Sequence, residues 1–340
     1  MSLGNAPRIA IIGCGAIAES YYLPAIARRP SVLERLVLVD SNQARVQEVA
    51  SAFNVPNYLC DYREVLNKVD GVIIAVPHHL HHPISMDFLA AGAHVLCEKP
   101  LAESVAEANE MVAQAKRYGV TISVNNTRRL FPAYSKIKEL LSNGAIGNPL
   151  SLKYFEGWRF DWPTASGFYF NTKTSRKGVL LDRGAHVLDA ICWWLGGRPK
   201  PISSENDSFG GPEAVAHISL EYNGCAIEVK LSWLSNLQNK YIISGELGVI
   251  ENGVEDWWVV PITSKSGKTE TIKLKSKEKD YNDFAHKMVA NFLDVISRHE
   301  KPLVPASEVI PSIALIEECY KTATRFRMPW YETLGAPDGK

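Results

Sequence analysis

Three ionisable residues stand at helical spacing in a segment that is otherwise almost wholly apolar. Asp182, His186 and Asp189 follow one another at steps of four and three positions, so a helix would carry all three on one face. Burying such groups together is costly unless they pair or line a polar cavity. The spacing therefore predicts a functional site on this face of the helix. The alternative is a core histidine with Asp182 as a helix cap.

A second pattern is typical of dinucleotide binding. Residues 13–18 read GCGAIA, a GxGxxA motif that directly follows a strand-like run and opens a helix-like one. Gly13 would permit the tight turn, and Gly15 would let backbone N–H groups approach a pyrophosphate at a helix N-terminus. The alternative is a strand-to-helix turn without a ligand.

Asp40 ends the next strand-like run, where a carboxylate can accept hydrogen bonds from the adenosine ribose. This position favours NAD over NADP, because a 2′-phosphate would meet a like charge. Arg45, on the following helix, weakly favours NADP, because an arginine could bind the 2′-phosphate. Asp40 could also serve as the N-cap of that helix. NAD is the expected cofactor, and NADP is not excluded.

Glu98, Lys99 and Pro100 close another strand-like run, at residues 94–100 (HVLCEKP). Open parallel sheets bind their ligands at the carboxyl ends of the strands. A lysine at this point would face the nicotinamide end of a bound dinucleotide.

These groups need a scaffold, and strand-like runs alternate with helix-like segments up to residue 126. This alternation predicts a doubly wound parallel sheet of the Rossmann type. The main strands are expected at 8–13, 36–40, 71–77, 94–100 and 121–126. Helices are expected to about residue 28, from the second strand through residue 52, and at 83–91 and 104–118. We expect a dinucleotide-binding domain over residues 1–126.

Longer β-like runs follow residue 126 and predict a large, mostly antiparallel open sheet. They lie at 149–158, 213–224 and 226–234, and residues 262–279 are typical of an exposed hairpin or loop. Helices are expected at 132–141, 181–195, 281–299 and 306–325, the last two packing back on the body. The fold class is therefore α/β, with an α+β substrate-binding and oligomerisation domain over residues 127–340.

Composition excludes several classes of function. The chain has 340 residues, and its 37 Lys and Arg balance 37 Asp and Glu, so neither nucleic acid nor an anionic membrane is an expected partner. Its six cysteines are scattered singly, as in proteins of a reducing compartment. No run is long and apolar enough to be a signal peptide or a membrane span, so a cytoplasmic location is expected.

Several motifs occur in a fixed order along nearly the whole chain. They are the GxGxxA turn, Ala75-Val76-Pro77 with His81, the run 91–102 around Glu98-Lys99-Pro100, Arg128-Arg129-Leu130-Phe131-Pro132-Ala133, and Asp182-Arg183-Gly184-Ala185-His186 with Asp189. In this combination the chain resembles the family of glucose-fructose oxidoreductase, inositol dehydrogenase and MocA (Gfo/Idh/MocA).

The resemblance implies an enzyme that transfers a hydride between a nicotinamide cofactor and a secondary alcohol or ketone. The substrate would be a sugar, a cyclitol or a nucleotide-linked sugar. Lys99 and His186 would stand at the reacting carbon, and either could carry the proton of the hydroxyl. Asp182 would bind a substrate hydroxyl or orient His186.

The same resemblance and the strand ends give a set of expected contacts. The cofactor would contact Gly13, Gly15, Ala16, Ile17, Asp40, Val76, Pro77, His78, His81, Glu98 and Lys99. The substrate would contact Asp182 and His186, with Arg129 chosen over its neighbour Arg128 and Trp162 chosen from an aromatic-rich loop. No metal is expected, although residues 78–82 read HHLHH.

Two positions depart from the family pattern. Pro77 is followed by His78 where relatives often have asparagine, which puts the usual contact near the nicotinamide ribose in doubt. Arg176-Lys177-Gly178 replaces a usual triple glycine and adds two cations near the expected cavity. These cations would suit an anionic substrate group, or they are solvated loop charges.

Two other functions stay open. One is a sugar oxidoreductase that recycles a tightly held cofactor, and the other is a non-catalytic sensor that binds the dinucleotide. The resemblance also implies a homodimer or homotetramer joined through the open face of the C-terminal sheet.

Overall fold

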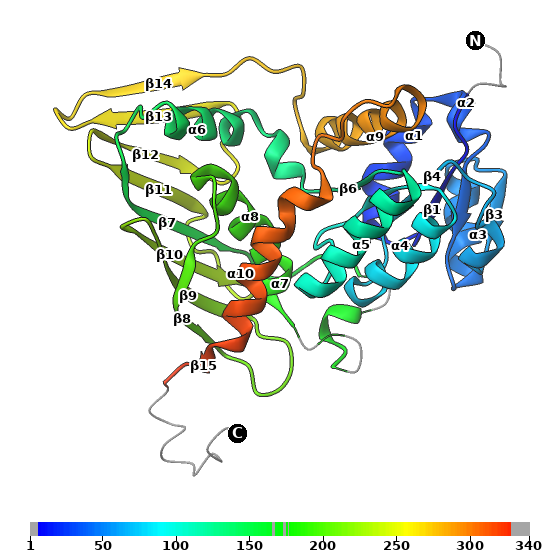
Figure 1. Cartoon of the computed structure of the whole chain (residues 1–340), viewed down its shortest axis with the longest axis horizontal. Helices are drawn as coiled ribbons and strands as arrows, with labels where there is room; N and C mark the ends of the chain where they lie inside the picture. The colour runs from blue at the N-terminus through cyan, green and yellow to red at the C-terminus, as the bar shows by residue number, and fades with distance from the viewer. Residues whose placement is uncertain (1–5, 165–166, 173–174, 176, 328–340) are drawn as a thin grey trace.

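The computed structural model describes residues 6–164, 167–172, 175 and 177–327. Two β-sheets dominate it, each with its own hydrophobic core (Figure 1). Within this part of the chain, no helix has the length and apolar character needed to cross a bilayer.

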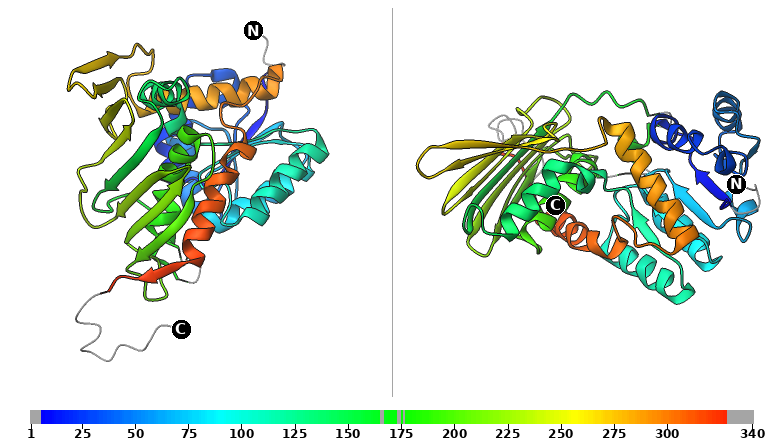
Figure 2. Two further views of the ribbon diagram at one scale, coloured as in Figure 1. Left: turned by 60° about the vertical axis from the view of Figure 1, so that its left-hand side comes forward. Right: turned by 90° about the horizontal axis from the view of Figure 1, so that it is seen from above.

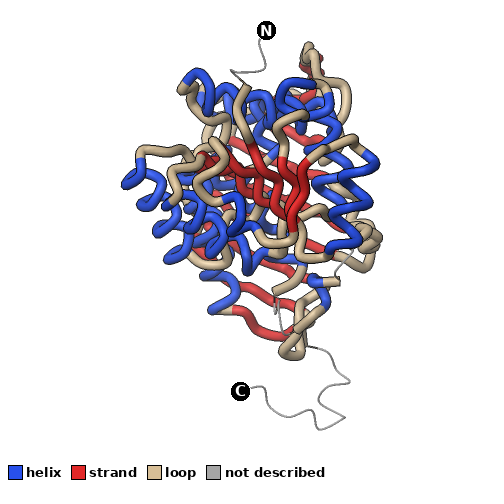
Figure 3. The backbone as a smooth tube through the Cα atoms, turned by 90° about the vertical axis from the view of Figure 1, so that its right-hand side faces the viewer, coloured by secondary structure: helices blue, strands red, loops and turns tan. Residues whose placement is uncertain are grey.

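The first sheet has six parallel strands in the order β3-β2-β1-β4-β5-β6, the strand order of a Rossmann fold. The strands are β1 (Ile9–Ile12), β2 (Val37–Val39), β3 (Asn57–Leu59), β4 (Gly71–Ile74), β5 (His94–Cys97) and β6 (Ile122–Val124). Figure 3 shows helices on both faces of this sheet. The central strands are buried along their whole length, which explains their continuous apolar runs. The predicted doubly wound sheet is confirmed.

The connections of this sheet are helices and short helical turns. They are η2 (Ala18–Tyr22), α1 (Leu23–Ala27), α2 (Pro30–Leu33), α3 (Gln43–Ala52), η3 (Tyr62–Val65), η4 (His78–Leu80), α4 (His81–Ala90) and α5 (Val105–Tyr118). The bounds of α5 follow from its caps. The Ser104 side chain accepts a hydrogen bond from the backbone N–H of Glu107, and Gly119 ends the helix at a φ of 67°.

The second sheet has nine strands in the order β14-β13-β12-β11-β7-β10-β9-β8-β15. They are β7 (Pro149–Gly157), β8 (Lys200–Asn206), β9 (Val215–Tyr222), β10 (Cys225–Ser232), β11 (Lys240–Gly245), β12 (Gly248–Gly253), β13 (Val259–Ser264), β14 (Thr269–Lys273) and β15 (Ala323–Arg325). Most pairs are antiparallel; β7 with β10 and β8 with β15 are parallel. The predicted open, mostly antiparallel sheet is confirmed, and β13 and β14 form the expected hairpin.

Helices cover one face of the nine-stranded sheet (Figures 1 and 2). They are α6 (Pro132–Ser142), α7 (Val179–Asp182), α8 (Gly184–Leu195) and α10 (Ile310–Lys321). The remaining short turns are η5 (Thr127–Leu130), η6 (Phe168–Phe170) and η7 (Ala306–Val309), of which η7 contacts β6 and α5. The helix expected at 181–195 is broken at Arg183 into α7 and α8, and Gly196 ends α8 at a φ of 71°.

The C-terminal part of the chain joins the two halves. Helix α9 (Tyr281–Arg298) packs on η2 and α1, and its Met288, Val289, Phe292 and Leu293 belong to the core of the parallel sheet. The expectation that the C-terminal helices pack back on the body fits this contact. The helix expected at 306–325 is shorter, because α10 ends at Lys321 and the chain then adds β15 to the sheet edge beside β8.

Candidate active site

One large cavity lies at the carboxyl ends of the parallel strands and extends to the second sheet. Its volume is about 1230 Å³, which exceeds the range of about 300–1,000 Å³ typical of a site for one small ligand. The cavity therefore has room for a dinucleotide and a second molecule. It is lined by the expected site residues Gly13, Gly15, Ala16, Ile17, Asp40, Val76, Pro77, His78, His81, Glu98, Lys99, Trp162, Asp182 and His186.

The two glycines of the GxGxxA turn have different constraints. Gly13 has a φ of 95°, and a Cβ added to it would lie 2.3 Å from the carbonyl oxygen of Ala75 on the neighbouring strand connection. Gly15 meets nothing within 4 Å, because its missing side chain faces the cavity. The turn thus needs Gly13 for its backbone, whereas Gly15 leaves a cradle open for a phosphate group. A dinucleotide fits this arrangement.

Asp40 is held firmly at the far end of the cavity. Its Oδ2 accepts a hydrogen bond from the Cys14 N–H at 2.8 Å, and its Oδ1 accepts one from the Asn42 N–H at 2.9 Å. Asn42, not Asp40, caps α3 with its side chain. Arg45 donates to the Cys14 carbonyl at 2.8 Å and pairs with Glu19 and Glu48, so its guanidinium is already committed. Arg45 therefore favours NADP less than its position in the sequence indicated.

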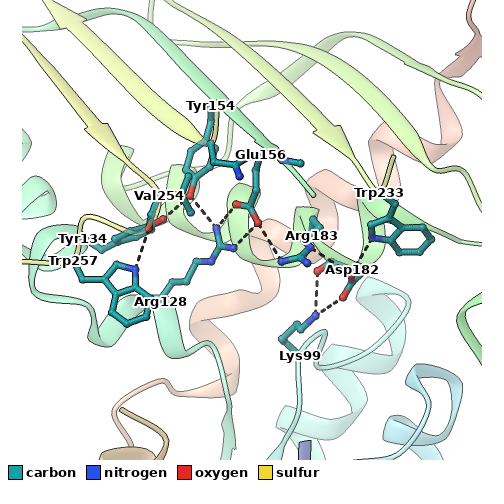
Figure 4. A network of polar contacts seen from close by, with 12 residues as sticks. Lys99, Arg128, Tyr134, Tyr154, Glu156, Asp182, Arg183, Trp233, Val254 and Trp257 are labelled. Carbon is teal, nitrogen blue, oxygen red and sulfur yellow. Dashed lines mark hydrogen bonds and ion pairs between the residues drawn. The ribbon is translucent and has the colours of Figure 1, made fainter. Parts of the chain in front are cut away.

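Lys99 and Asp182 meet where the two halves of the chain come together. The Lys99 Nζ lies 2.6 Å from Asp182 Oδ1 and 3.3 Å from the Asp182 carbonyl oxygen (Figure 4). The indole Nε1–H of Trp233 donates to Asp182 Oδ2 at 3.2 Å. Burial alone would raise the pKa of Asp182, but Lys99 and then Arg183 outweigh it and lower that pKa to about 2. The carboxylate is therefore ionised beside a cationic amine.

His186 reaches the same cavity from the first turn of α8. Burial lowers the pKa of His186 well below its usual value, and the cations Lys99, Arg128 and Arg183 lower it further. Its Nδ1 is buried, and no described residue forms a hydrogen bond with it. The result is a neutral imidazole with hydrogen-bonding capacity to offer a substrate hydroxyl.

Glu98 anchors the strand end that carries Lys99. Its Oε1 accepts hydrogen bonds from the Tyr22 hydroxyl at 2.6 Å and from the Asn125 amide at 2.7 Å, and its Oε2 accepts one from the Lys99 N–H at 3.1 Å. Burial raises the pKa of Glu98, although these donors lower it in part. Because three donors hold this buried side chain, the direction of the Lys99 peptide is fixed before any ligand binds.

The histidines of the run HHLHH point to different places. His78 is buried at the cavity wall, with its ring edge against Phe168 and Tyr169. His81 lies between the Val76 carbonyl oxygen, 2.9 Å from its Nε2, and the Pro100 carbonyl oxygen, 2.7 Å from its Nδ1. Burial lowers the pKa of His81 to about 4, and the neutral ring donates a hydrogen bond to one of these two carbonyls. His82 instead contacts Glu110 at 2.9 Å. His78 thus stands where relatives often have asparagine, and His81 ties two strand ends together.

Aromatic side chains form the wall opposite the parallel sheet. Trp158, Phe160, Trp162, Phe168 and Tyr169 all line the cavity, together with Tyr21 and Tyr281. The Trp162 ring stacks on Tyr21 with a centroid distance of 6.4 Å and an interplanar angle of 13°. Such a wall suits the apolar face of a sugar ring.

Arg129, the arginine expected to contact the substrate, lies apart from the other expected site residues. Arg129 does not line the cavity; its guanidinium binds Asp189 through two hydrogen bonds of 2.7 and 2.8 Å and reaches Glu308 at 2.7 Å. Its neighbour Arg128 lines the cavity instead. Asp189 is therefore a structural partner of Arg129. Of the three ionisable residues expected on one helical face, Asp182 and His186 line the cavity and Asp189 does not.

Of the two extra loop cations, only Lys177 lies among the described residues, because Arg176 falls outside them. Lys177 donates to the Glu103 carbonyl at 2.7 Å and does not line the cavity.

Several cavity residues were missed by sequence reasoning. Arg128 was passed over in favour of its neighbour, and Arg183 was left without a role although it stands inside the motif that carries Asp182 and His186. A charged residue between two site residues was the available signal for Arg183. Tyr21 and Tyr281 gave no signal, because tertiary packing alone brings them to the cavity.

Comparison with known proteins agrees with this geometry. The family model for the oxidoreductase family with an NAD-binding Rossmann fold matches residues 7–126, and the model for a GFO/IDH/MocA C-terminal domain matches residues 134–251. The chain belongs to the Gfo/Idh/MocA family. It is 28% identical over 333 residues to mouse trans-1,2-dihydrobenzene-1,2-diol dehydrogenase, an alignment that covers 92% of this chain and 96% of that protein.

Solved structures with the same fold include enzymes with bound cofactor. A levoglucosan dehydrogenase in complex with NADH and levoglucosan has a TM-score of 0.80 at 20% identity, covering 92% of this chain and 96% of that one. A 3-ketoreductase from Actinomadura kijaniata in complex with NADP and TDP-benzene has a TM-score of 0.82 at 22% identity, covering 96% of this chain and all of the other. This member of the Gfo/Idh/MocA family is an NAD(P)-dependent oxidoreductase.

Proposed function

We propose that this family member interconverts a secondary alcohol and a ketone on a sugar, cyclitol or nucleotide-linked sugar. The observation that carries the proposal is the 2.6 Å contact between Lys99 Nζ and Asp182 Oδ1, with His186 lining the same cavity as the dinucleotide turn. The nicotinamide group would accept or supply the hydride when the dinucleotide is bound. The side chains around the reacting carbon then have to hold the hydroxyl and move one proton.

Lys99 is the group assigned to that proton. In ketone reduction its ammonium donates a proton to the substrate oxygen, and in alcohol oxidation its neutral amine takes the proton back. Asp182 stabilises the ammonium and fixes its position. Burial and the nearby cations lower the pKa of His186 well below its usual value, so we assign its neutral ring to position the substrate oxygen by a hydrogen bond.

NAD is the assigned cofactor, because Asp40 places a fixed carboxylate at the ribose end while Arg45 is engaged by Glu19, Glu48 and a backbone carbonyl. A thermal-shift titration with NAD, NADH, NADP and NADPH tests this choice without a substrate. We expect stabilisation by NAD and NADH, and a loss of this selectivity in Asp40→Ser. Asp294→Asn, a change outside the cavity, is the matched control. Stabilisation by NADP and NADPH alone would contradict the choice.

The open face of the nine-stranded sheet is the assigned subunit interface. Helices cover only the opposite face among the described residues (Figure 2). Phe155 of β7 stands between the buried residues Tyr154 and Glu156, so its side chain lies on the uncovered face, with Lys230 of β10 beside its ring. Sedimentation velocity should show a dimer or tetramer that Phe155→Asp converts to monomers. A monomeric parent protein at micromolar concentration would contradict this assignment.

The reaction itself is tested by the nicotinamide absorbance. Purified protein is mixed with NAD and a panel of sugars, cyclitols and nucleotide sugars, and in the reverse direction with NADH and the matching ketones. Steady absorbance change with at least one pair is expected. A protein that binds NAD and changes absorbance with no member of the panel would favour the sensor, and cofactor retained through purification would favour internal recycling.

A further inference from the structure

Arg183 brings an additional cation into the cavity, next to the proposed reaction centre. It stands at the junction of α7 and α8, directly after Asp182, and its side chain is 31% exposed. The guanidinium carbon lies 4.8 Å from the centroid of the Trp158 ring, which supports one face of the group (Figure 4 shows the guanidinium between Glu156 and Asp182). Its position is therefore set by stacking and not by short polar contacts.

Both carboxylates near Arg183 already have closer partners. Arg128 binds Glu156 through two hydrogen bonds of 2.5 and 2.6 Å, and Lys99 binds Asp182 at 2.6 Å. Arg183 stays 3.6 Å from Glu156 and 3.9 Å from Asp182, beyond hydrogen-bond distance. Its Nε is buried, and no described residue accepts a hydrogen bond from that atom.

The charges at this end of the cavity balance, but their hydrogen bonds do not. Lys99, Arg128 and Arg183 stand among three carboxylates, Glu98, Glu156 and Asp182. Lys99 and Arg128 form short hydrogen bonds with these carboxylates, whereas the Arg183 guanidinium lies beyond hydrogen-bond distance of both of its neighbours. A ligand carboxylate that reaches the exposed part of this guanidinium would supply charged hydrogen bonds that the described residues do not.

We infer that Arg183 binds a carboxylate of the substrate, so that the preferred substrates are sugar acids and not neutral sugars. This inference rests on the proposed function. Arg183 Nε lies 3.9 Å from Asp182, which in turn contacts Lys99, so the carboxylate would lie close to the carbon that reacts. A planar guanidinium with its face on Trp158 presents its N–H edge to a carboxylate with matching geometry. A diphosphate would require further cations, and Lys177 is engaged by Glu103 outside the cavity.

Matched pairs of substrates test the inference. D-glucuronate is compared with D-glucose, and D-galacturonate with D-galactose, in steady-state assays with NAD. In the parent protein kcat/KM should be higher for the acid of a pair. Arg183→Gln should lower kcat/KM for the acid by about 10- to 100-fold, the value of a charged hydrogen bond, and leave the neutral sugar nearly unchanged. Arg198→Gln, which alters a surface ion pair with Glu318, is the control and should change neither.

A binding measurement separates this inference from the proposed reaction. NADH and an alcohol cannot react with each other, so thermal shifts of the NADH complex report binding of each compound without turnover. The acid of a pair should stabilise the parent protein more than the neutral sugar does, and Arg183→Gln should remove the difference. Equal shifts for acid and neutral sugar, or a larger shift with UDP-glucose than with either acid, would overturn the inference even if neutral sugars are turned over. Acid-selective shifts without turnover would instead contradict the proposed reaction alone.

Discussion

Lys99 and Asp182 are 83 residues apart in the chain, yet Lys99 Nζ lies 2.6 Å from Asp182 Oδ1. One stands at the end of β5 in the parallel sheet and the other at the end of α7 on the second sheet. Since the contact joins the cofactor side of the cavity to the substrate side, it fixes the reacting amine relative to both ligands. Removing either partner would leave a charge in a largely buried place.

The glycines of the GxGxxA turn should separate folding from cofactor binding. A side chain at position 15 enters the open cradle, so Gly15→Val should keep the unfolding temperature of the ligand-free protein and lose its stabilisation by NAD. Gly13→Ala should lower that temperature, because its Cβ would collide with the Ala75 carbonyl. Thermal scans with and without NAD check both. Normal NAD stabilisation in Gly15→Val would place the pyrophosphate elsewhere.

Arg129 should prove structural. Arg129→Gln leaves the buried carboxylate of Asp189 without its cation, and we expect a loss of about 3–5 kcal/mol in the free energy of unfolding. Arg198→Gln breaks an exposed pair and should cost about 1 kcal/mol or less. Urea denaturation measures both. A fully stable Arg129→Gln variant that has lost affinity for the substrate would instead show that Arg129 contacts the substrate.

Acid should weaken the fold through His81. Because burial lowers its pKa to about 4, His81 takes up a proton more readily when unfolded, so its contribution is complete above about pH 6.5 and is lost as the pH falls toward 4. His78 and His186, whose pKa values are also lowered by burial, act in the same direction. The free energy of unfolding should therefore fall as the pH is lowered from about 6.5 to 4. The fall should be about 3 kcal/mol smaller in His81→Asn than in the parent protein. An equal fall in both proteins would contradict a neutral His81.

The sequence was sufficient for the parallel sheet and for most of the cavity, because buried strands leave continuous apolar runs and strand ends mark the binding edge. It could not distinguish Arg128 from Arg129. Both lie in the short turn η5, where successive side chains point in different directions, and their orientation depends on Glu156 and Asp189, partners far along the chain. The three-residue strand β15 could not be predicted from the sequence for a similar reason, since only its pairing with β8 defines it.

The central claim is that Lys99 moves the proton at the reacting carbon and that the dinucleotide binds without the help of Lys99. The most direct test measures NAD binding and nicotinamide absorbance change on the same preparation of Lys99→Met, beside the parent protein and His186→Asn. We predict that Lys99→Met binds NAD normally and turns over the best substrate about 10²- to 10⁴-fold more slowly. His186→Asn should retain more activity, since its amide can still hydrogen-bond the substrate oxygen. Turnover in Lys99→Met close to that of the parent protein would contradict the account.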